Sequence, residues 1–320
     1  MNKLPDLAAL EAACDLIYPH LQQTPHISWP MLNTRAGFEL WLKHENHNPT
    51  GSFKVRGGLV YLHNLLQREP NVPGVVAATR GNFGQSIAYA AAQHGLRSVV
   101  CVPEGNSPDK NRAMQTLGAE LIVHGADFDE SVAHAIRLAE SEGLHLIPSF
   151  HMDLVAGVAT YAFELLQSVS PDKIYVPIGL GSGICGVAAA KQALGKKTEI
   201  IGVVAEGADT YSQSYRARRL IPTNAAHTIA DGLAVRNPSG PALEVMLSHV
   251  ANVITVTDIQ IEQAMRMLFE DTHNVVEGAG AAATAGAFAE ADQNKGQTVA
   301  AVVTGSNVHR QEYTRILQAT

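Results

Sequence analysis

Short apolar runs alternate with amphipathic, alanine-rich stretches along most of the chain. The apolar runs have the length and β-branched content of buried strands, and they lie at residues 74–79, 98–103, 119–125, 173–178, 199–206 and 298–305. Helical patterns separate them, including SIAYAAAQHG, SVAHAIRLAES and GVAAAKQAL. Strands that alternate with helices are typical of parallel sheets covered by helices on both faces, so we predict an α/β fold.

Ligands of open parallel sheets bind beyond the carboxyl ends of the strands, which directs attention to the loops that follow the six runs. The chain has 320 residues, enough for one large domain or two lobes that share a cleft. Its first 20 residues predict an acidic amphipathic helix and do not resemble a signal peptide. No apolar run approaches the roughly 20 residues that span a bilayer, so we expect no membrane partner.

Charge and cysteine content narrow the functional classes. The net charge is −7, from 23 basic and 30 acidic residues, and one short basic cluster, which we expect to be a solvated face, consists of Arg216, Arg218 and Arg219. Nucleic acid is therefore not an expected partner. The chain has three isolated cysteines, Cys14, Cys101 and Cys185. Their odd number and wide spacing argue against a disulfide framework or a metal site and favour a cytoplasmic location.

The segment GSFKVRGG contains a lysine at a predicted helix start. Pro49 and Gly51 predict a turn, and Ser52 is the expected N-cap, which places Lys54 in the first helical turn. The positive end of the helix macrodipole disfavours a charged lysine there, so the pKa of Lys54 should fall, as suits an amine nucleophile. A surface lysine at a helix start is the simpler alternative.

Two loops join a predicted strand to a predicted helix. Residues 79–86, TRGNFGQS, could bind a carboxylate with backbone N–H groups, or could be a plain turn with an asparagine cap. Residues 179–186, GLGSGICG, could hold a phosphate. The second loop also matches the dinucleotide pattern G-x-G-x-x-G, with Glu206 about 20 residues further on, so an NAD site stays open. Thr304 adds a hydroxyl at the end of the last strand.

Taken together, these four segments resemble the fold-type II pyridoxal-phosphate enzymes, in particular the serine/threonine dehydratase and serine racemase group. The family's Schiff-base lysine segment, GSFKxRG, matches residues 51–57, and its SxGNH-like loop matches at Asn82. The resemblance implies a pyridoxal 5'-phosphate site formed by Phe53, Lys54, Asn82, Gly179, Leu180, Gly181, Ser182, Gly183, Glu277 and Thr304. It makes an NAD-binding oxidoreductase and a non-catalytic ligand-binding protein the weaker alternatives, because neither requires the lysine.

The resemblance also implies an organisation like that of the tryptophan synthase β chain. Residues 1–73 and 150–320 would form a large cofactor-binding domain, and residues 74–149 would form a small domain that carries the substrate loop. That loop would meet the amino-acid substrate through Thr79, Arg80, Gly81, Asn82 and Phe83. The chain would act as a homodimer, and no metal ion is expected because Ser212 stands where metal-binding relatives have an aspartate.

The implied reaction is the dehydration and deamination of a β-hydroxy amino acid, with Lys54 as the catalytic residue and threonine or serine as the plainest substrate.

Two positions depart from the family. Arg80 replaces a serine or alanine and would suit a second carboxylate, as in 3-hydroxyaspartate, whereas Phe83 replaces a histidine and would suit an aromatic group, as in phenylserine. We expect no racemase activity, because a guanidinium stays protonated and cannot replace a serine as acid and base.

Overall fold

Two sheets organise residues 3–319, the part of the chain that the computed structural model describes. The larger sheet has the strand order β1 (His26–Ser28), β2 (Glu39–His44), β10 (Thr298–Val303), β7 (Lys173–Pro177), β8 (Glu199–Ala205) and β9 (Asn252–Val256). All its neighbouring strands run parallel except β1, which pairs antiparallel with β2. The smaller sheet is parallel throughout, in the order β5 (Glu120–Val123), β4 (Ser98–Val102), β3 (Val75–Ala78) and β6 (His145–Leu146).

Helices cover both faces of the larger sheet. Alternate residues of β7 enter different cores: Ile174 and Val176 pack with helices α7 and α8, whereas Tyr175 packs with α11 and α12. The helices are α1 (Leu7–Ile17), α2 (Pro30–Ala36), α3 (Lys54–Arg68), α4 (Asn82–Gln93), α5 (Pro108–Thr116), α6 (Phe128–Glu142), α7 (Met152–Ser168), α8 (Ser182–Ala193), α9 (Thr210–Ala217), α10 (Gly240–His249), α11 (Asp258–Thr272), α12 (Gly278–Ala289), α13 (Ala291–Asn294) and α14 (Arg310–Gln318). Short 3-10 turns are η1 (Glu45–His47), η2 (Glu206–Ala208) and η3 (Asp231–Leu233).

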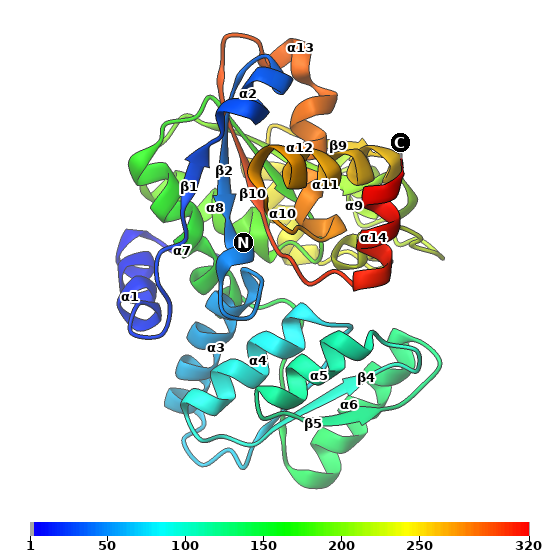
Figure 1. Ribbon diagram of the computed structural model, residues 1–320. Coiled ribbons are helices and arrows are strands. Elements are labelled where there is room, and N and C mark those ends of the chain that lie inside the picture. The colour runs from blue at the N-terminus through cyan, green and yellow to red at the C-terminus, as the bar shows by residue number, and fades with distance from the viewer. Residues whose placement is uncertain (1–2, 320) are drawn as a thin grey trace.

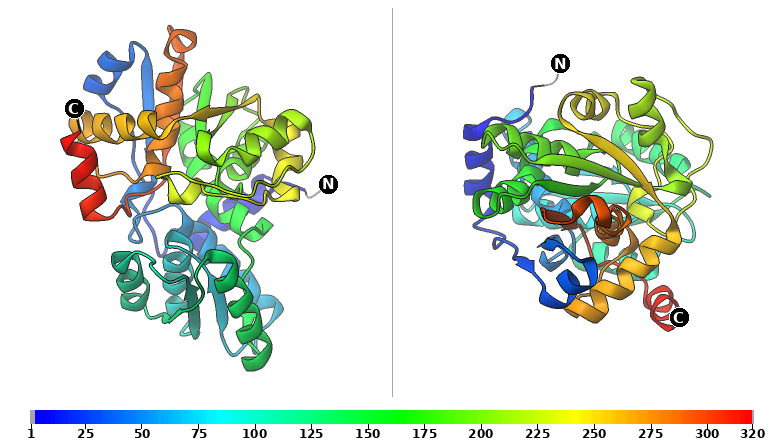
Figure 2. Two further views of the ribbon diagram at one scale, coloured as in Figure 1. Left: turned by 90° about the vertical axis from the view of Figure 1, so that its right-hand side faces the viewer. Right: turned by 90° about the horizontal axis from the view of Figure 1, so that it is seen from above.

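The molecule consists of two lobes, one around each sheet. In Figure 1 the larger sheet and the C-terminal helices form the upper lobe, and α4, α5, α6 and the smaller sheet form the lower one. The left view of Figure 2, turned by 90° about the vertical axis, shows the same two bodies. Loop residues that follow strands of both sheets line a common cavity, among them Arg80 after β3 and Asn307 after β10.

Helix α3 connects the two lobes. Its apolar residues share one core with β3 and α4, and it crosses α4 so closely that a Cβ on Gly58 would lie 2.3 Å from Ser86 Oγ. The helix that begins with Lys54 thus packs against the smaller lobe, which we predicted to consist of residues 74–149. The domain boundaries near residues 73 and 150 stay a prediction.

All six predicted strands are present in the structure. The helical patterns coincide with α4, α6 and α8 to within two residues at their C-terminal ends, and the N-terminal pattern forms α1. Strands β1, β2, β6 and β9 were not predicted. Cys14, Cys101 and Cys185 are free and buried, and the short basic cluster at residues 216–219 is exposed, as expected. Within the described chain, no helix is long and apolar enough to cross a membrane.

Candidate active site

The lysine segment and the C-terminal turn are held together at the end of adjacent strands. Phe53 N donates to Thr304 O at 3.1 Å, and Ser306 N donates to Gly51 O at 2.9 Å. Because β2, β10 and β7 are neighbours in the sheet, the glycine loop after β7 lies at the same edge. The sheet order therefore brings together three segments that are far apart in the sequence.

Lys54 is the first residue of α3, as predicted, but its environment differs from the prediction in two ways. Ser52 is not the N-cap: the helix is preceded by Phe53 without a side-chain cap, and Ser52 Oγ has no hydrogen-bond partner among the described residues. Burial lowers the pKa of Lys54 to about 8, while the carboxylate of Glu277 opposes the shift. The direction of the predicted pKa change is correct, and its main cause is desolvation and not the helix dipole.

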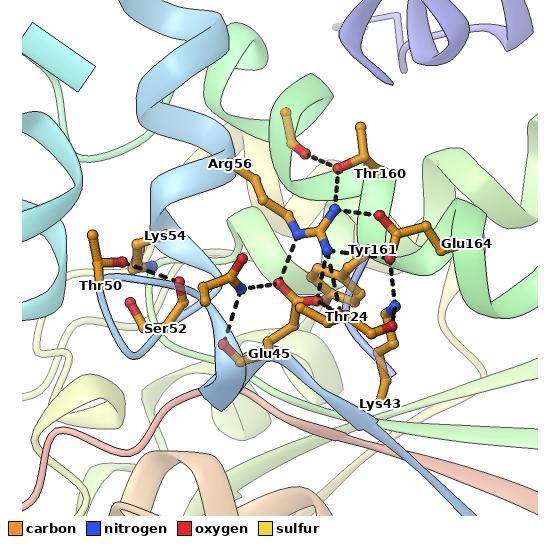
Figure 3. Close-up of polar contacts among 12 residues, drawn as sticks. Thr24, Lys43, Glu45, Thr50, Ser52, Lys54, Arg56, Thr160, Tyr161 and Glu164 are labelled. Atoms are coloured by element: carbon orange, nitrogen blue, oxygen red, sulfur yellow. Dashed lines mark hydrogen bonds and ion pairs between the residues drawn. The ribbon is translucent and has the colours of Figure 1, made fainter. Parts of the chain in front are cut away.

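A buried ionic cluster fixes the first turn of α3. The Arg56 guanidinium donates from Nε to Glu45 Oε2 at 2.8 Å and from Nη1 to Glu164 Oε1 at 2.6 Å, and Lys43 also pairs with Glu164. Figure 3 shows these side chains converging from α3, the end of β2 and α7, with Lys54 beside them. Burial alone would raise the pKa of Glu45, but Arg56 and Lys43 lower it. The charges balance, so the cluster anchors the lysine-bearing turn to the larger lobe.

Phe53 lies between the lysine and the glycine loop. Lys54 Nζ is 4.5 Å from the centroid of the Phe53 ring, and that ring packs edge-on against Tyr161 at 6.0 Å. A Cβ on Gly183 would lie 3.8 Å from the Phe53 ring. Phe53 therefore forms a wall that faces both the reactive amine and the start of α8.

The glycine loop is a close-packed turn at the N-terminus of α8. Gly181 is the N-cap and has φ +103, a conformation that side chains disfavour, and its added Cβ would lie 2.5 Å from Ala242 Cβ. Tyr211 donates to Leu180 O at 2.9 Å, and Ser182 begins the helix. Near the loop start, a Cβ on Gly179 would lie 2.4 Å from Gly232 O. The first N–H groups of α8 are left to bind an anion.

The loop after β3 reaches across the cleft to the larger lobe. Asn82 Nδ2 donates to Glu277 Oε1 at 2.6 Å, and Asn307 Nδ2 donates to Asn82 Oδ1 at 2.8 Å. Thr79 Oγ1 accepts from Gly81 N at 3.0 Å and shapes the turn before α4. The N-cap of α4 is Gly81, so the alternative of an asparagine cap is wrong.

Glu277 contacts the C-terminal turn, to which Thr304 belongs: Glu277 N donates to Gly305 O at 3.0 Å. Glu277 precedes α12 without capping it through its side chain, and burial raises the pKa of its carboxyl group, against the effects of Lys110 and Asn82. Thr304 is buried and donates from Oγ1 to Ala279 O at 3.3 Å. Glu277 lines the cavity between the lobes, whereas Thr304 is buried behind it at the end of β10.

A cavity of about 260 Å³ opens between the lobes. Of the predicted site residues, Arg80 and Glu277 line it. Lys54 and the glycine loop do not line it, and Phe83 packs against the core shared by α3 and α4. Arg80 is exposed, and no hydrogen bond or ion pair to another residue of the described chain occupies its guanidinium. Sequence reasoning missed several lining residues, which carried no motif, among them Lys110, Asp231, His309 and Glu312.

Residues 17–305 match the family model described as pyridoxal-phosphate dependent enzyme. The chain belongs to this family. The predictions of a fold-type II pyridoxal-phosphate enzyme and of its cofactor are thereby confirmed. An aspartate racemase crystal structure, described as pyridoxal 5'-phosphate-dependent, superposes with a TM-score of 0.91 at 30% sequence identity and covers 98% of this chain and 99% of that chain.

Two curated relatives differ in how much of their length this chain spans. The biosynthetic L-threonine dehydratase of Pasteurella multocida is 32% identical over 297 residues, which are 92% of this chain but 58% of that protein. The L-threo-3-hydroxyaspartate ammonia-lyase of Saccharomyces cerevisiae is 30% identical over 307 residues, which are 95% of this chain and 94% of that protein. The chain spans a little over half the length of the first relative and nearly all of the second.

The residues at the cleft fit the cofactor of the family. The N-terminus of α8 offers unpaired N–H groups beside a glycine that admits no side chain without displacing Ala242, as a phosphate cradle requires. Lys54 offers an amine with a pKa of about 8. When bound, pyridoxal phosphate supplies an electron sink for a negative charge that develops at the α-carbon of an amino acid.

Proposed function

We propose that this chain is a carbon–nitrogen lyase that converts a β-hydroxy amino acid to a 2-oxo acid and ammonia, with threonine and serine as the first candidate substrates. The observation that carries the proposal is the amine of Lys54, whose pKa of about 8 leaves part of it neutral near pH 7. The names of both curated relatives, a threonine dehydratase and a hydroxyaspartate ammonia-lyase, support the reaction class. Water is lost in the elimination and regained in the final hydrolysis, so the overall products are the 2-oxo acid and ammonia.

In this proposal each part of the site has a defined task, and Lys54 has two. The neutral amine of Lys54 accepts the α-proton of the substrate and is also the covalent attachment point of the cofactor. N–H groups at the start of α4, in the loop from Thr79 to Phe83, bind the α-carboxylate. The proposed cofactor contacts are the ring wall, the phosphate cradle and the groups near the pyridine: Phe53, Asn82, Gly179, Leu180, Gly181, Ser182, Gly183, Glu277 and Thr304.

A substrate screen tests this function. Purified protein loaded with pyridoxal phosphate is incubated with threonine, serine, 3-hydroxyaspartate and phenylserine, and both 2-oxo acid and ammonia are measured. The proposal requires equal amounts of the two products from at least one of these amino acids. Absence of both products from every substrate, or inversion of the α-carbon without ammonia, contradicts it.

Arg80 favours 3-hydroxyaspartate as a second candidate substrate. Its guanidinium lines the cavity and has no partner within residues 3–319, so it is available to bind a carboxylate with two hydrogen bonds. We predict that Arg80→Ser changes the order of threonine, 3-hydroxyaspartate and phenylserine by kcat/KM, with 3-hydroxyaspartate losing roughly tenfold or more relative to threonine.

Steady-state kinetics on the three substrates measure the effect of Arg80→Ser. Arg137→Ser is the matched control, because Arg137 is an exposed arginine of α6 that does not line the cavity, and it should leave the order unchanged. A uniform fall for all three substrates would mean that Arg80 acts on folding or general positioning. An unchanged order would mean that its guanidinium does not contact the substrate.

We further propose that the chain works as a homodimer in the cytoplasm, with residues 74–149 as the small domain. The isolated, free cysteines support a reducing compartment. The separate four-stranded sheet supports the small domain, although α3 packs against the same lobe.

A further inference from the structure

Lys110 is a cation of the cavity wall. It lies in the first turn of α5, and its side chain is only 12% exposed. Its Cδ lies 2.6 Å from the position that a Cβ on Gly81 would take, so the aliphatic part of Lys110 covers the loop between β3 and α4. Arg80, which precedes that glycine, lines the same cavity. Two basic side chains thus lie at the loop that our proposed function assigns to the substrate.

The present partner of Lys110 is weakly held. Lys110 Nζ donates to Asp231 Oδ2 at 3.1 Å, and the Asp231 side chain is 58% exposed. Solvent screens such an exposed carboxylate and weakens the ion pair. An ammonium group has three donors, and within residues 3–319 this hydrogen bond is the one that Nζ makes. A second anion can therefore join or replace Asp231 at little cost.

The charged groups around the cavity leave Lys110 and Arg80 available to bind an incoming anion. Burial opposes the charged form of Lys110, but Glu277 and Asp231 raise its pKa, so it stays protonated. Burial raises the pKa of Glu277 and of Glu312. The side chains of threonine and serine carry no charge and would not use Lys110 or Arg80. A substrate with a second carboxylate would use both.

We propose that Lys110 is a specificity-determining residue that, together with Arg80, binds a carboxylate on the substrate side chain, and that it exchanges Asp231 for that carboxylate. This inference rests on the proposed function and narrows the substrate to a β-hydroxy dicarboxylic amino acid. Asp231 then acts as a competitor that holds the ammonium in place when no such substrate is bound. When the substrate binds, its carboxylate thus contacts α5 of the smaller lobe through Lys110.

Three variants test the role of Lys110 by kinetics. Lys110→Met keeps the length of the side chain and removes its charge, Lys110→Arg keeps the charge, and Asp231→Asn removes the competitor. For Lys110→Met we expect the ratio of kcat/KM for 3-hydroxyaspartate to that for threonine to fall roughly tenfold, mainly through KM. Lys110→Arg should restore most of the ratio, and Asp231→Asn should raise it. An unchanged ratio, or an equal fall for both substrates, overturns the inference.

Binding without turnover separates this inference from the proposed function. L-Aspartate and L-2-aminobutyrate lack a β-hydroxyl group, and their binding to the loaded enzyme is followed by the change in cofactor absorbance. Lys110→Met should weaken aspartate roughly tenfold relative to 2-aminobutyrate. Equal effects on the two ligands contradict the role of Lys110. If no hydroxy amino acid yields ammonia, the proposed function fails, and the binding comparison still decides whether Lys110 recognises the carboxylate.

Discussion

Replacing Lys54 with alanine is expected to abolish the production of 2-oxo acid and ammonia, with kcat reduced by roughly 10³-fold or more. The reason is that one side chain has two tasks in the proposed reaction, the attachment of the cofactor and the removal of the α-proton. No other lysine in the described chain combines the start of α3, contact with the Phe53 ring and a pKa of about 8. The measurement is a single-turnover and steady-state assay of the loaded variant.

Two controls separate this effect from a loss of folding. Lys295→Ala removes an exposed lysine whose partner among residues 3–319 is Asp292, and it should retain normal turnover. The Arg56 cluster anchors α3 independently of Lys54, so thermal unfolding of Lys54→Ala without cofactor should resemble that of the unchanged chain. Turnover within tenfold of the unchanged enzyme would show that Lys54 is not the catalytic base.

Replacing Gly181 with aspartate is expected to weaken the binding of pyridoxal phosphate by roughly 10²-fold or more, because charge-assisted hydrogen bonds are lost and a like charge is added. The backbone adds to the effect. Gly181 has φ +103, and its Cβ would have to displace Ala242, so any side chain strains the turn. Fluorescence titration of the cofactor-free protein measures the dissociation constant.

Two further glycine variants show whether the cradle or general strain is responsible. Gly181→Ala adds a Cβ without a charge and should have an intermediate effect. Gly195→Ala also forces a side chain into positive φ, but a Cβ there would have nothing within 4 Å, and it lies at the far end of α8. It should leave cofactor affinity unchanged. An unaltered affinity of Gly181→Asp, or saturable binding of NAD, would mean that the loop binds a different ligand.

Much of the sheet architecture could be predicted, because the six predicted strands are short, mostly apolar runs, and five of them are almost completely buried. The sixth, β5, is a partly exposed edge strand. Strand β2 was missed because its end contains Lys43 and His44, both buried. Lys43 is tolerated there because Glu164, on α7, neutralises it, and this partner lies 121 positions away in the sequence. Such compensation is a tertiary effect that no local pattern contains. Strand β6 has two residues and gives no periodic signal.

The site was predictable where local backbone geometry requires particular residues. Glycines at the α8 N-terminus and the lysine at the α3 start are of this kind. Lys110 and Asp231 were not predictable, because they lie on ordinary polar segments that become neighbours only when the lobes meet. The cause of the Lys54 pKa shift was also hidden, since burial depends on the whole fold.

Identification of the lysine that holds the cofactor tests the central claim most directly. The purified, loaded protein should be yellow, and reduction with borohydride should fix the pyridoxyl group covalently. Peptide mass spectrometry of the reduced protein should then locate that group on Lys54, in the peptide that spans the start of α3. A label on another lysine, or a protein that shows nicotinamide absorbance and takes up no pyridoxal phosphate, would contradict the account.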